Sequence, residues 1–146
     1  MFAQMMIPHH QQAVTISDLI LAKSGLSTEV TSLATAIKAA QQPEIEQMRG
    51  WLKAWGAPEG GDHGGHGSMG GMLTQAQLDA IGKAEGVEAE KLFLAGMIAH
   101  HEGAITMAKQ AETAGSNAEV KKLAATIIST QQAEIDQMKT LLAARP

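Results

Sequence analysis

An internal repeat constrains the fold of this chain more than any other feature. Residues 6–13, Met-Ile-Pro-His-His-Gln-Gln-Ala, match residues 97–104, Met-Ile-Ala-His-His-Glu-Gly-Ala. Further along each copy, residues 41–48, Gln-Gln-Pro-Glu-Ile-Glu-Gln-Met, match residues 131–138, Gln-Gln-Ala-Glu-Ile-Asp-Gln-Met. Two matched segments in the same order indicate that one supersecondary unit occurs twice.

Each copy has the sequence pattern of two helices joined by a short turn. In the second copy, Phe93, Met97 and His100 follow steps of three and four, which is the spacing of one helix face. Gly115 is a typical helix stop, and residues 116–119, Ser-Asn-Ala-Glu, have the form of a capping box that begins the next helix. Two such αα-hairpins bury their apolar faces most simply as an antiparallel four-helix bundle, so we expect an all-α fold.

The length of 146 residues fits a single domain, 1–146, with enough chain to bury a core. We divide it into repeat one, 2–56, a connector, 57–86, and repeat two, 87–144. The connector includes a stretch rich in glycine and histidine, which we expect to lack fixed structure until it binds a ligand. Residues 74–77, Thr-Gln-Ala-Gln, then have the form of a second capping box, which predicts a short helix.

Two prolines interrupt the helical pattern of repeat one. Pro8 is close to the start of the chain, so we expect it in or near the first helical turn, where a missing N–H has little effect. Pro43 falls in mid-helix and should kink that helix by freeing the carbonyl of Ala39. Its equivalent in repeat two is Ala133, so we expect the two halves to differ here.

Composition excludes several classes of site and partner. The chain has no cysteine, which rules out disulfides, thiolate zinc fingers, iron–sulfur clusters and a cysteine nucleophile. Its 11 basic and 15 acidic residues give a net charge of −4, which argues against nucleic-acid binding. The sequence has no run of about eighteen apolar residues, so we expect no transmembrane segment.

The six histidines fall into three clusters, each with methionine nearby. These are His9–His10 beside Met6, His63 and His66 beside Met69 and Met72, and His100–His101 beside Met97. In a hairpin with a short turn, residues at equal distance from the turn lie at one level, which places each helical pair beside the Gln/Glu segment of its own copy. We expect all three clusters to gather at one end of the bundle, where the connector leaves and returns.

Imidazole nitrogen and thioether sulfur together form a soft to borderline ligand set. Such a set suits Cu(I), and with more imidazole Cu(II), better than Mg or Ca, and zinc is a further ion that it could bind in vitro. The candidate metal ligands are Met6, His9, His10, Met48, His63, His66, Met69, Met72, Met97, His100, His101 and Met138. The candidates for orienting the imidazoles through hydrogen bonds are Gln41, Glu44, Gln131 and Glu134.

Other interpretations of the same residues stay open. The methionines could pack the core while the histidines hydrogen-bond the facing Gln and Glu, which would make a metal-free structural or interaction bundle. The His/Met segment of the connector could be a plain linker. A metal-dependent oxidoreductase could use the same site, although the sequence shows no substrate pocket. A ferritin-type di-iron centre is disfavoured because no Glu-x-x-His pairs project from the helices.

The pattern Phe-x-x-x-Met-Ile-x-His-His-x-x-Ala, followed by Gln-x-x-Glu-Ile-x-x-Met, occurs twice and resembles the domain of unknown function 305 family. The resemblance covers nearly the whole chain. It implies a ferritin-like four-helix bundle, export to the bacterial cell envelope and, in some members, copper binding through Met and His. The motif positions are Met6, His9, His10, Gln41, Glu44 and Met48, with the equivalents Met97, His100, His101, Gln131, Glu134 and Met138.

We therefore predict a copper-binding protein of the periplasm or cell surface, with a role in copper homeostasis or resistance and no catalysis as its main role. The flexible His/Met segment would capture the ion, and the bundle would hold it. A copper-donor or copper-acceptor protein, or a second copy in a homo-oligomer, would be the further partner. Because the sequence begins directly at Met1 and Phe2, we expect a mature or trimmed form without its export signal.

Overall fold

The computed structural model describes residues 2–59 and 70–146, and within these ranges it contains helices and no strand. The helices are α1 (Phe2–Leu21), α2 (Thr28–Trp55), α3 (Gln75–Lys83), α4 (Gly86–Ala114) and α5 (Ala118–Ala143). The expected short helix after the connector is therefore present as α3. His63, His66 and Met69 lie outside the described residues.

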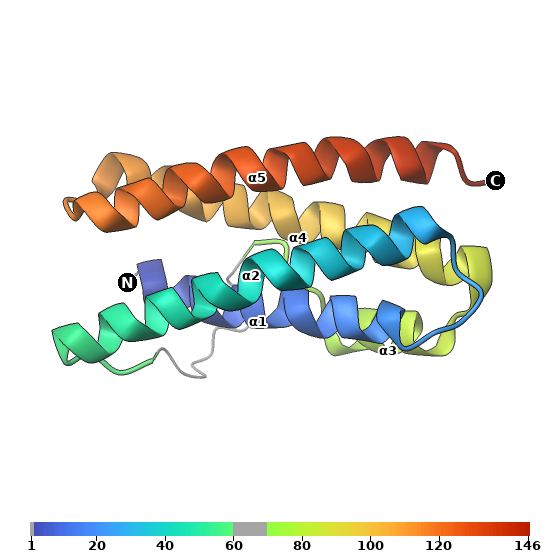
Figure 1. Ribbon diagram of the computed structural model, residues 1–146, viewed down its shortest axis with the longest axis horizontal. Helices are drawn as coiled ribbons and strands as arrows, with labels where there is room; N and C mark the ends of the chain where they lie inside the picture. The colour runs from blue at the N-terminus through green and yellow to red at the C-terminus, as the bar shows by residue number, and fades with distance from the viewer. Residues whose placement is uncertain (1, 60–69) are drawn as a thin grey trace.

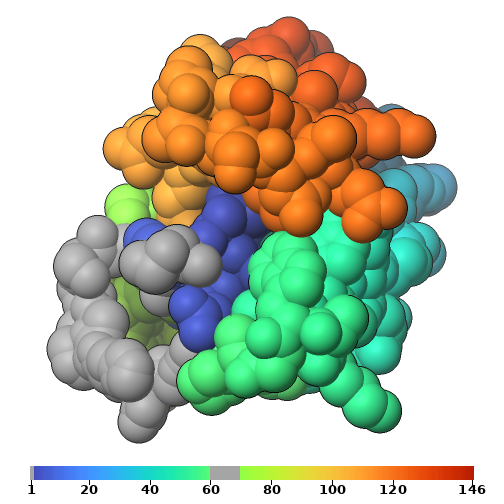
Figure 2. Space-filling model, turned by 90° about the vertical axis from the view of Figure 1, so that its left-hand side faces the viewer, coloured from blue at the N-terminus to red at the C-terminus, as the bar shows by residue number. Residues whose placement is uncertain are grey.

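The long helices form two hairpins, α1 with α2 and α4 with α5, that pack together as an antiparallel four-helix bundle (Figure 1). The hairpins meet through α1 and α4, which run in opposite directions. At one end Phe2 and Met5 share an apolar groove with Met107, and at the other Lys23 donates a hydrogen bond to the Gly82 carbonyl over 2.9 Å. Figure 2 looks onto the first of these ends, where α1 lies between α2 and the α4–α5 hairpin. The predicted fold class is confirmed.

The two helical histidine clusters do come together, but the expectation that they lie at one end of the bundle is wrong. The connector cluster lies outside the described residues except for Met72. Gln4 bonds the Pro58 carbonyl, so α2 ends beside the start of α1. Glu90, near the start of α4, bonds the Ser27 amide at the opposite end. The chain therefore leaves α2 at one end of the bundle and enters α4 at the other, and α2 is about 42 Å long. With the hairpins packed in opposite directions, both helical His pairs lie near mid-length.

The helix ends are set by local chemistry. The Ser27 side chain caps α2, and Thr74 with Gln77 forms the predicted capping box of α3. The cap of α5 is Asn117, whose side chain accepts bonds from the amides of residues 119 and 120, so the expected Ser116 cap is off by one residue. Pro8 lies inside α1 beyond its first turn, because the helix already begins at Phe2.

A layer of buried polar residues divides the core into two apolar clusters. One cluster holds Met6 and Met48, the other Met97 and Met138. In each long helix the change from one cluster to the other falls at a buried polar residue, apart from Ile105 on α4. The residues of this polar layer are His9, His10, Gln41, His100, His101 and Gln131. The repeat thus produces one transverse layer to which all four long helices contribute.

A second buried polar group ties the chain together at the end where α4 begins. Arg145 donates to Glu90 over 2.8 Å and to the Ser27 hydroxyl over 2.9 Å. The Ser27 amide donates to the other Glu90 oxygen over 2.6 Å. Burial alone would raise the pKa of Glu90, but the hydrogen bonds from Ser27 and Arg145 outweigh it and hold the pKa below its usual value.

Replacing Arg145 with Met should therefore destabilise the fold, because it leaves the Glu90 carboxylate buried without its cation. We expect the free energy of unfolding to fall by about 3 kcal/mol, measured by urea denaturation at pH 7. Lys38→Met is the matched control, since it removes an exposed pair with Asp18 and should change stability by less than about 1 kcal/mol. Equal effects of the two variants would contradict the proposed role of the buried group.

Candidate metal centre

The polar layer is built around two imidazoles in contact, with their planes tilted. The rings of His9 and His100 have centroids 3.9 Å apart and planes inclined at 39°. These residues occupy equivalent positions in the two repeats. The same position of each repeat therefore meets at this contact, as it does at the two-fold interface of a homodimer. All four helical histidines have at most 1% of their surface exposed. Antiparallel packing of α1 and α4 thus creates a buried site from residues that lie far apart in the sequence.

The other two histidines each bond a carboxylate of the facing helix in the same hairpin. His10 Nε2 lies 2.6 Å from Glu44 Oε1, and His101 Nε2 lies 2.6 Å from Glu134 Oε1. Since a carboxylate oxygen accepts, each Nε2 carries the hydrogen. In the neutral ring, Nδ1 then has a free lone pair. Glu44 and Glu134 therefore lie where they orient the two imidazoles, as a hydrogen-bonded carboxylate does for histidine ligands in metal sites.

His9 is oriented by the backbone instead. Its Nε2 lies 3.1 Å from the carbonyl oxygen of Gly70, which can only accept, so His9 also exposes a free Nδ1 lone pair. His100 differs, because neither of its ring nitrogens has a hydrogen-bond partner in the described part of the chain. The other buried side-chain acceptors that lack a partner among residues 2–59 and 70–146 are His9 Nδ1, His10 Nδ1, His101 Nδ1, Gln41 Oε1, Gln131 Oε1 and, outside the polar layer, Ser17 Oγ.

These unpartnered atoms fit a cation. Leaving a buried acceptor without a donor is unfavourable by about 1–3 kcal/mol, and here several such lone pairs gather in one layer. A soft metal ion would satisfy nitrogen lone pairs in the way that a hydrogen-bond donor would. The donor set, neutral imidazole near thioether, is one that copper accepts.

The two central histidines, His9 and His100, are uncharged at neutral pH. Burial lowers the pKa of His9 to about 4; the Gly70 hydrogen bond opposes this, and the charges of His10 and His101 add to it. Burial also holds the pKa of His100 well below its usual value, and the charges of His9, His101 and His10 act in the same direction. Both rings are therefore neutral at pH 7, which is the form that binds metal.

The methionines divide by position. Met6, Met48, Met97 and Met138 are fully buried, on the two sides of the polar layer. Met72 is half-buried and lines a surface pocket against α3 and α4. In the described ranges no three His, Asp or Glu side chains form a metal-binding group by themselves. An ion held in the layer would therefore have at most two of these side chains as ligands, which leaves room for thioether sulfur.

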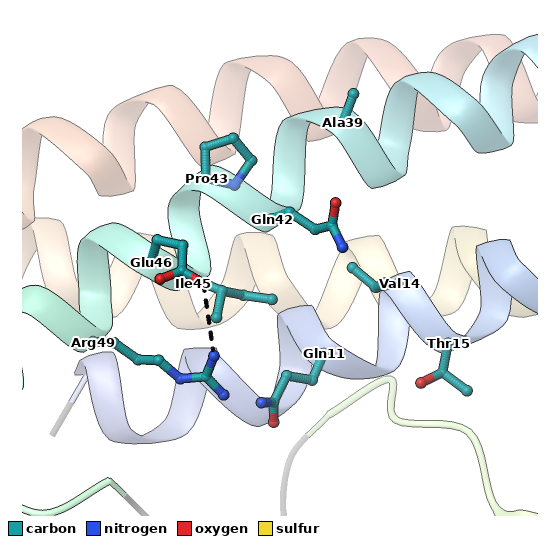
Figure 3. Close-up of a pocket in the computed structure, with 9 residues that line it drawn as sticks. All are labelled: Gln11, Val14, Thr15, Ala39, Gln42, Pro43, Ile45, Glu46 and Arg49. Carbon is teal, nitrogen blue, oxygen red and sulfur yellow. Dashed lines mark ion pairs between the residues drawn. The ribbon is translucent and has the colours of Figure 1, made fainter.

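A large surface pocket lies apart from the polar layer. It is an open groove of about 760 Å³ between α1 and α2, lined by residues such as Gln11, Gln42 and Pro43 (Figure 3). Glu46 and Arg49 form an ion pair of 3.9 Å within it. Its lining contains neither His nor Met, so it offers no soft ligand and is separate from the polar layer.

Sequence reasoning missed the segment that orients His9. Gln12 forms two hydrogen bonds to the backbone of Leu73, of 3.0 and 2.8 Å, and so holds this segment beside α1. The equivalent of Gln12 in repeat two is Gly103, which contacts Gly70. The sequence did contain a signal for this segment, namely the difference between Gln12 and Gly103 at one position of two otherwise matching repeats. Such a difference indicates that the position has unequal roles in the two copies.

Residues 1–142 match the family described as Domain of unknown function (DUF305). The chain belongs to the DUF305 family. A curated relative, uncharacterized protein L153 of Acanthamoeba polyphaga mimivirus, is 43% identical over 71 residues. That match covers 49% of this chain and 40% of the relative, so the resemblance reaches less than half of either protein.

Solved structures of this family resemble the DUF305 chain over almost all of its length. A Streptomyces coelicolor DUF305 protein that has been inferred to be secreted is 34% identical, with a TM-score of 0.91, covering 97% of this chain and 90% of its own. CopM in the Cu(II)-bound form is 36% identical, with a TM-score of 0.83, covering 97% and 93%. In the Cu(I)-bound form, CopM is 32% identical, with a TM-score of 0.81, covering 96% and 91%.

Acid should destabilise the metal-free protein through the two central histidines, His9 and His100. Between pH 6.5 and pH 4 the unfolded chain binds a proton at His9 that the folded chain does not, so stability falls as pH falls. By pH 5 the loss from His9 alone should be about 2 kcal/mol, and His100 should add to it. Urea denaturation in EDTA at pH 7, 6 and 5 measures this loss. A free energy of unfolding that stays constant over that range would contradict the assigned burial.

Proposed function

We propose that this protein binds copper in the polar layer between its two hairpins. The observation that carries the proposal is the set of buried nitrogen lone pairs without hydrogen-bond partners in the described structure, contributed by equivalent positions of both repeats. The nitrogen ligands would be drawn from Nδ1 of His9, His10 and His101 and one ring nitrogen of His100, with at most two of them on one ion, because no three His, Asp or Glu side chains of the described residues form a metal-binding group. The sulfur ligands would come from the four buried methionines, Met6, Met48, Met97 and Met138.

Several physical features support copper over harder ions. Neutral imidazole and thioether are poor ligands for Mg and Ca but good ones for Cu(I) and, with more nitrogen, for Cu(II). The protein has no cysteine, so its soft ligands do not depend on thiols and would survive an oxidising compartment. CopM, with the same fold and about a third of its residues identical, has been solved with Cu(I), with Cu(II) and with silver.

The biological role that we propose is copper sequestration in the bacterial cell envelope, for homeostasis or resistance. Within 2–59 and 70–146 no helix has the length and apolar character needed to cross a bilayer. The connector residues His63, His66, Met69 and Met72 would capture the ion before it enters the bundle. A copper-donor or copper-acceptor protein, or a second copy of this chain, would be the partner in exchange, and zinc is an ion that the site could accept in vitro.

Removing the helical ligands of repeat two tests this proposal. The variant carrying His100→Ala, His101→Ala and Met97→Leu together should lose at least about a hundredfold in Cu(I) affinity, since single supporting contacts already contribute tenfold or more. The measurement is an anaerobic Cu(I) titration against a competing chelator, with folding checked by circular dichroism. Met5→Leu is the control, because Met5 is 41% exposed and outside the layer.

An unchanged affinity in that triple variant would overturn the layer as the copper site. Affinity lost only when residues 60–72 are deleted would move the site to the connector. Wild-type protein that binds neither Cu(I) nor Cu(II) would leave a structural or interaction bundle as the better description. Turnover of a cuprous or peroxide substrate by the loaded protein would favour an oxidoreductase.

The carboxylates that orient His10 and His101 should contribute to affinity without binding the ion. Glu44→Gln weakens the bond that fixes the His10 ring, so we expect Cu(I) affinity to fall about tenfold. Glu46→Gln is the matched control, because it lies in the same helix with its side chain 77% exposed. The same competition titration measures both variants, and equal affinities would show that Glu44 plays no part.

A further inference from the structure

Residues Gly70–Leu73, here named the strap, cross the contact between α1 and α4. The Gly70 carbonyl accepts the hydrogen bond from His9. Three residues further along, Leu73 exchanges two backbone hydrogen bonds with the Gln12 side chain. His9 and Gln12 lie about one turn apart on α1, so the strap is tied to one helix face at two points.

The strap approaches α4 so closely that α4 needs glycine beneath it. A Cβ added at Gly103 would collide with the Gly70 carbonyl, and one at Gly96 would lie 2.9 Å from Leu73 Cδ2. Within the strap, Gly71 has φ +82°, and a Cβ there would collide with the Ala99 carbonyl. The backbone path of the strap is therefore fixed by shape as well as by hydrogen bonds.

The two glycines that let the strap approach occur in repeat two only. The equivalents of Gly96 and Gly103 in repeat one are Met5 and Gln12, which have large side chains. Because of this difference the strap orients His9 and leaves its equivalent, His100, without a hydrogen bond in the described structure. The two central imidazoles are equivalent in position but not in surroundings.

We propose that the strap is a positioning element of the copper site. The Gly70 carbonyl holds the hydrogen of His9 on Nε2, so that Nδ1 is the atom offered to the ion. Gln12 and the two α4 glycines keep that carbonyl in place, which makes Gln12 a positioning residue that touches no metal. This inference rests on the proposed copper function, but its claim about the His9 tautomer holds for the metal-free protein and can be tested there.

The first experiment reads the His9 tautomer in metal-free, ¹⁵N-labelled protein by long-range ¹H–¹⁵N correlation NMR. The wild type should show His9 with its hydrogen on Nε2. Gly103→Ala should displace the strap and bring His9 to a mixture of tautomers. The control is Gly50→Ala, also inside a long helix, where a Cβ meets nothing within 4 Å. An Nδ1–H tautomer in the wild type, or an unchanged tautomer in Gly103→Ala, would overturn the proposal.

The second experiment measures Cu(I) affinity of the same variants by competition. We expect Gly103→Ala to lose about tenfold or more, in the range found when partners of metal-ligating histidines are removed, and Gly50→Ala to match the wild type. If Gly103→Ala fails to fold, Gln12→Leu takes its place, since it removes both bonds to Leu73 without adding a collision. Unchanged Cu(I) affinity in the folded strap variant would overturn the positioning role.

The two claims fail in different ways. Wild-type protein that binds no copper would refute the proposed function, and the tautomer measurement would still decide whether the strap sets His9. Wild-type protein that binds copper, with a strap variant of equal affinity and equal tautomer, would refute the positioning role alone.

Discussion

The contact of His9 with His100 is the interaction on which the rest of this structure depends. It lies where α1 and α4 cross, and these helices carry the packing between the two hairpins. Two imidazoles without a charged partner are favoured in contact inside a buried core when both are uncharged, since a buried unpaired charge is far more unfavourable than a buried neutral ring. Because both rings are neutral, each has one ring nitrogen that carries hydrogen and one with a free lone pair.

Both repeats contribute equivalent residues to the polar layer. The strap, however, gives the two central histidines different surroundings. Each hairpin supplies one His–Glu pair, one central imidazole and one buried glutamine from matching positions. The strap contacts only the seam between α1 and α4, where Gln12 and Gly103 occupy one repeat position with opposite properties. The two copies of the repeat thus keep the same candidate ligands but differ in the residues that contact the strap.

The sequence was sufficient for what depends on local geometry. Helix periodicity and capping residues predicted the two hairpins, and a short turn fixes which residues face each other within a hairpin, as with His10 and Glu44. The connector is long enough to reach either end of the bundle, so periodicity could not decide how the hairpins are oriented. That freedom is why the predicted gathering at one end was wrong. The strap was missed for a related reason, because close backbone approach depends on glycines whose neighbours are distant in sequence.

The position of the polar layer between two apolar clusters has a consequence for folding specificity. If one hairpin slid along the other by a helical turn, about 5.4 Å, imidazoles would face Ile and Met side chains and the His9–His100 contact would be lost. A single polar position in an apolar interface is known to select one alignment of helices in this way, at some expense in stability. The layer that gathers the proposed ligands therefore also acts as a register mark, so that the hairpins can align in one way only.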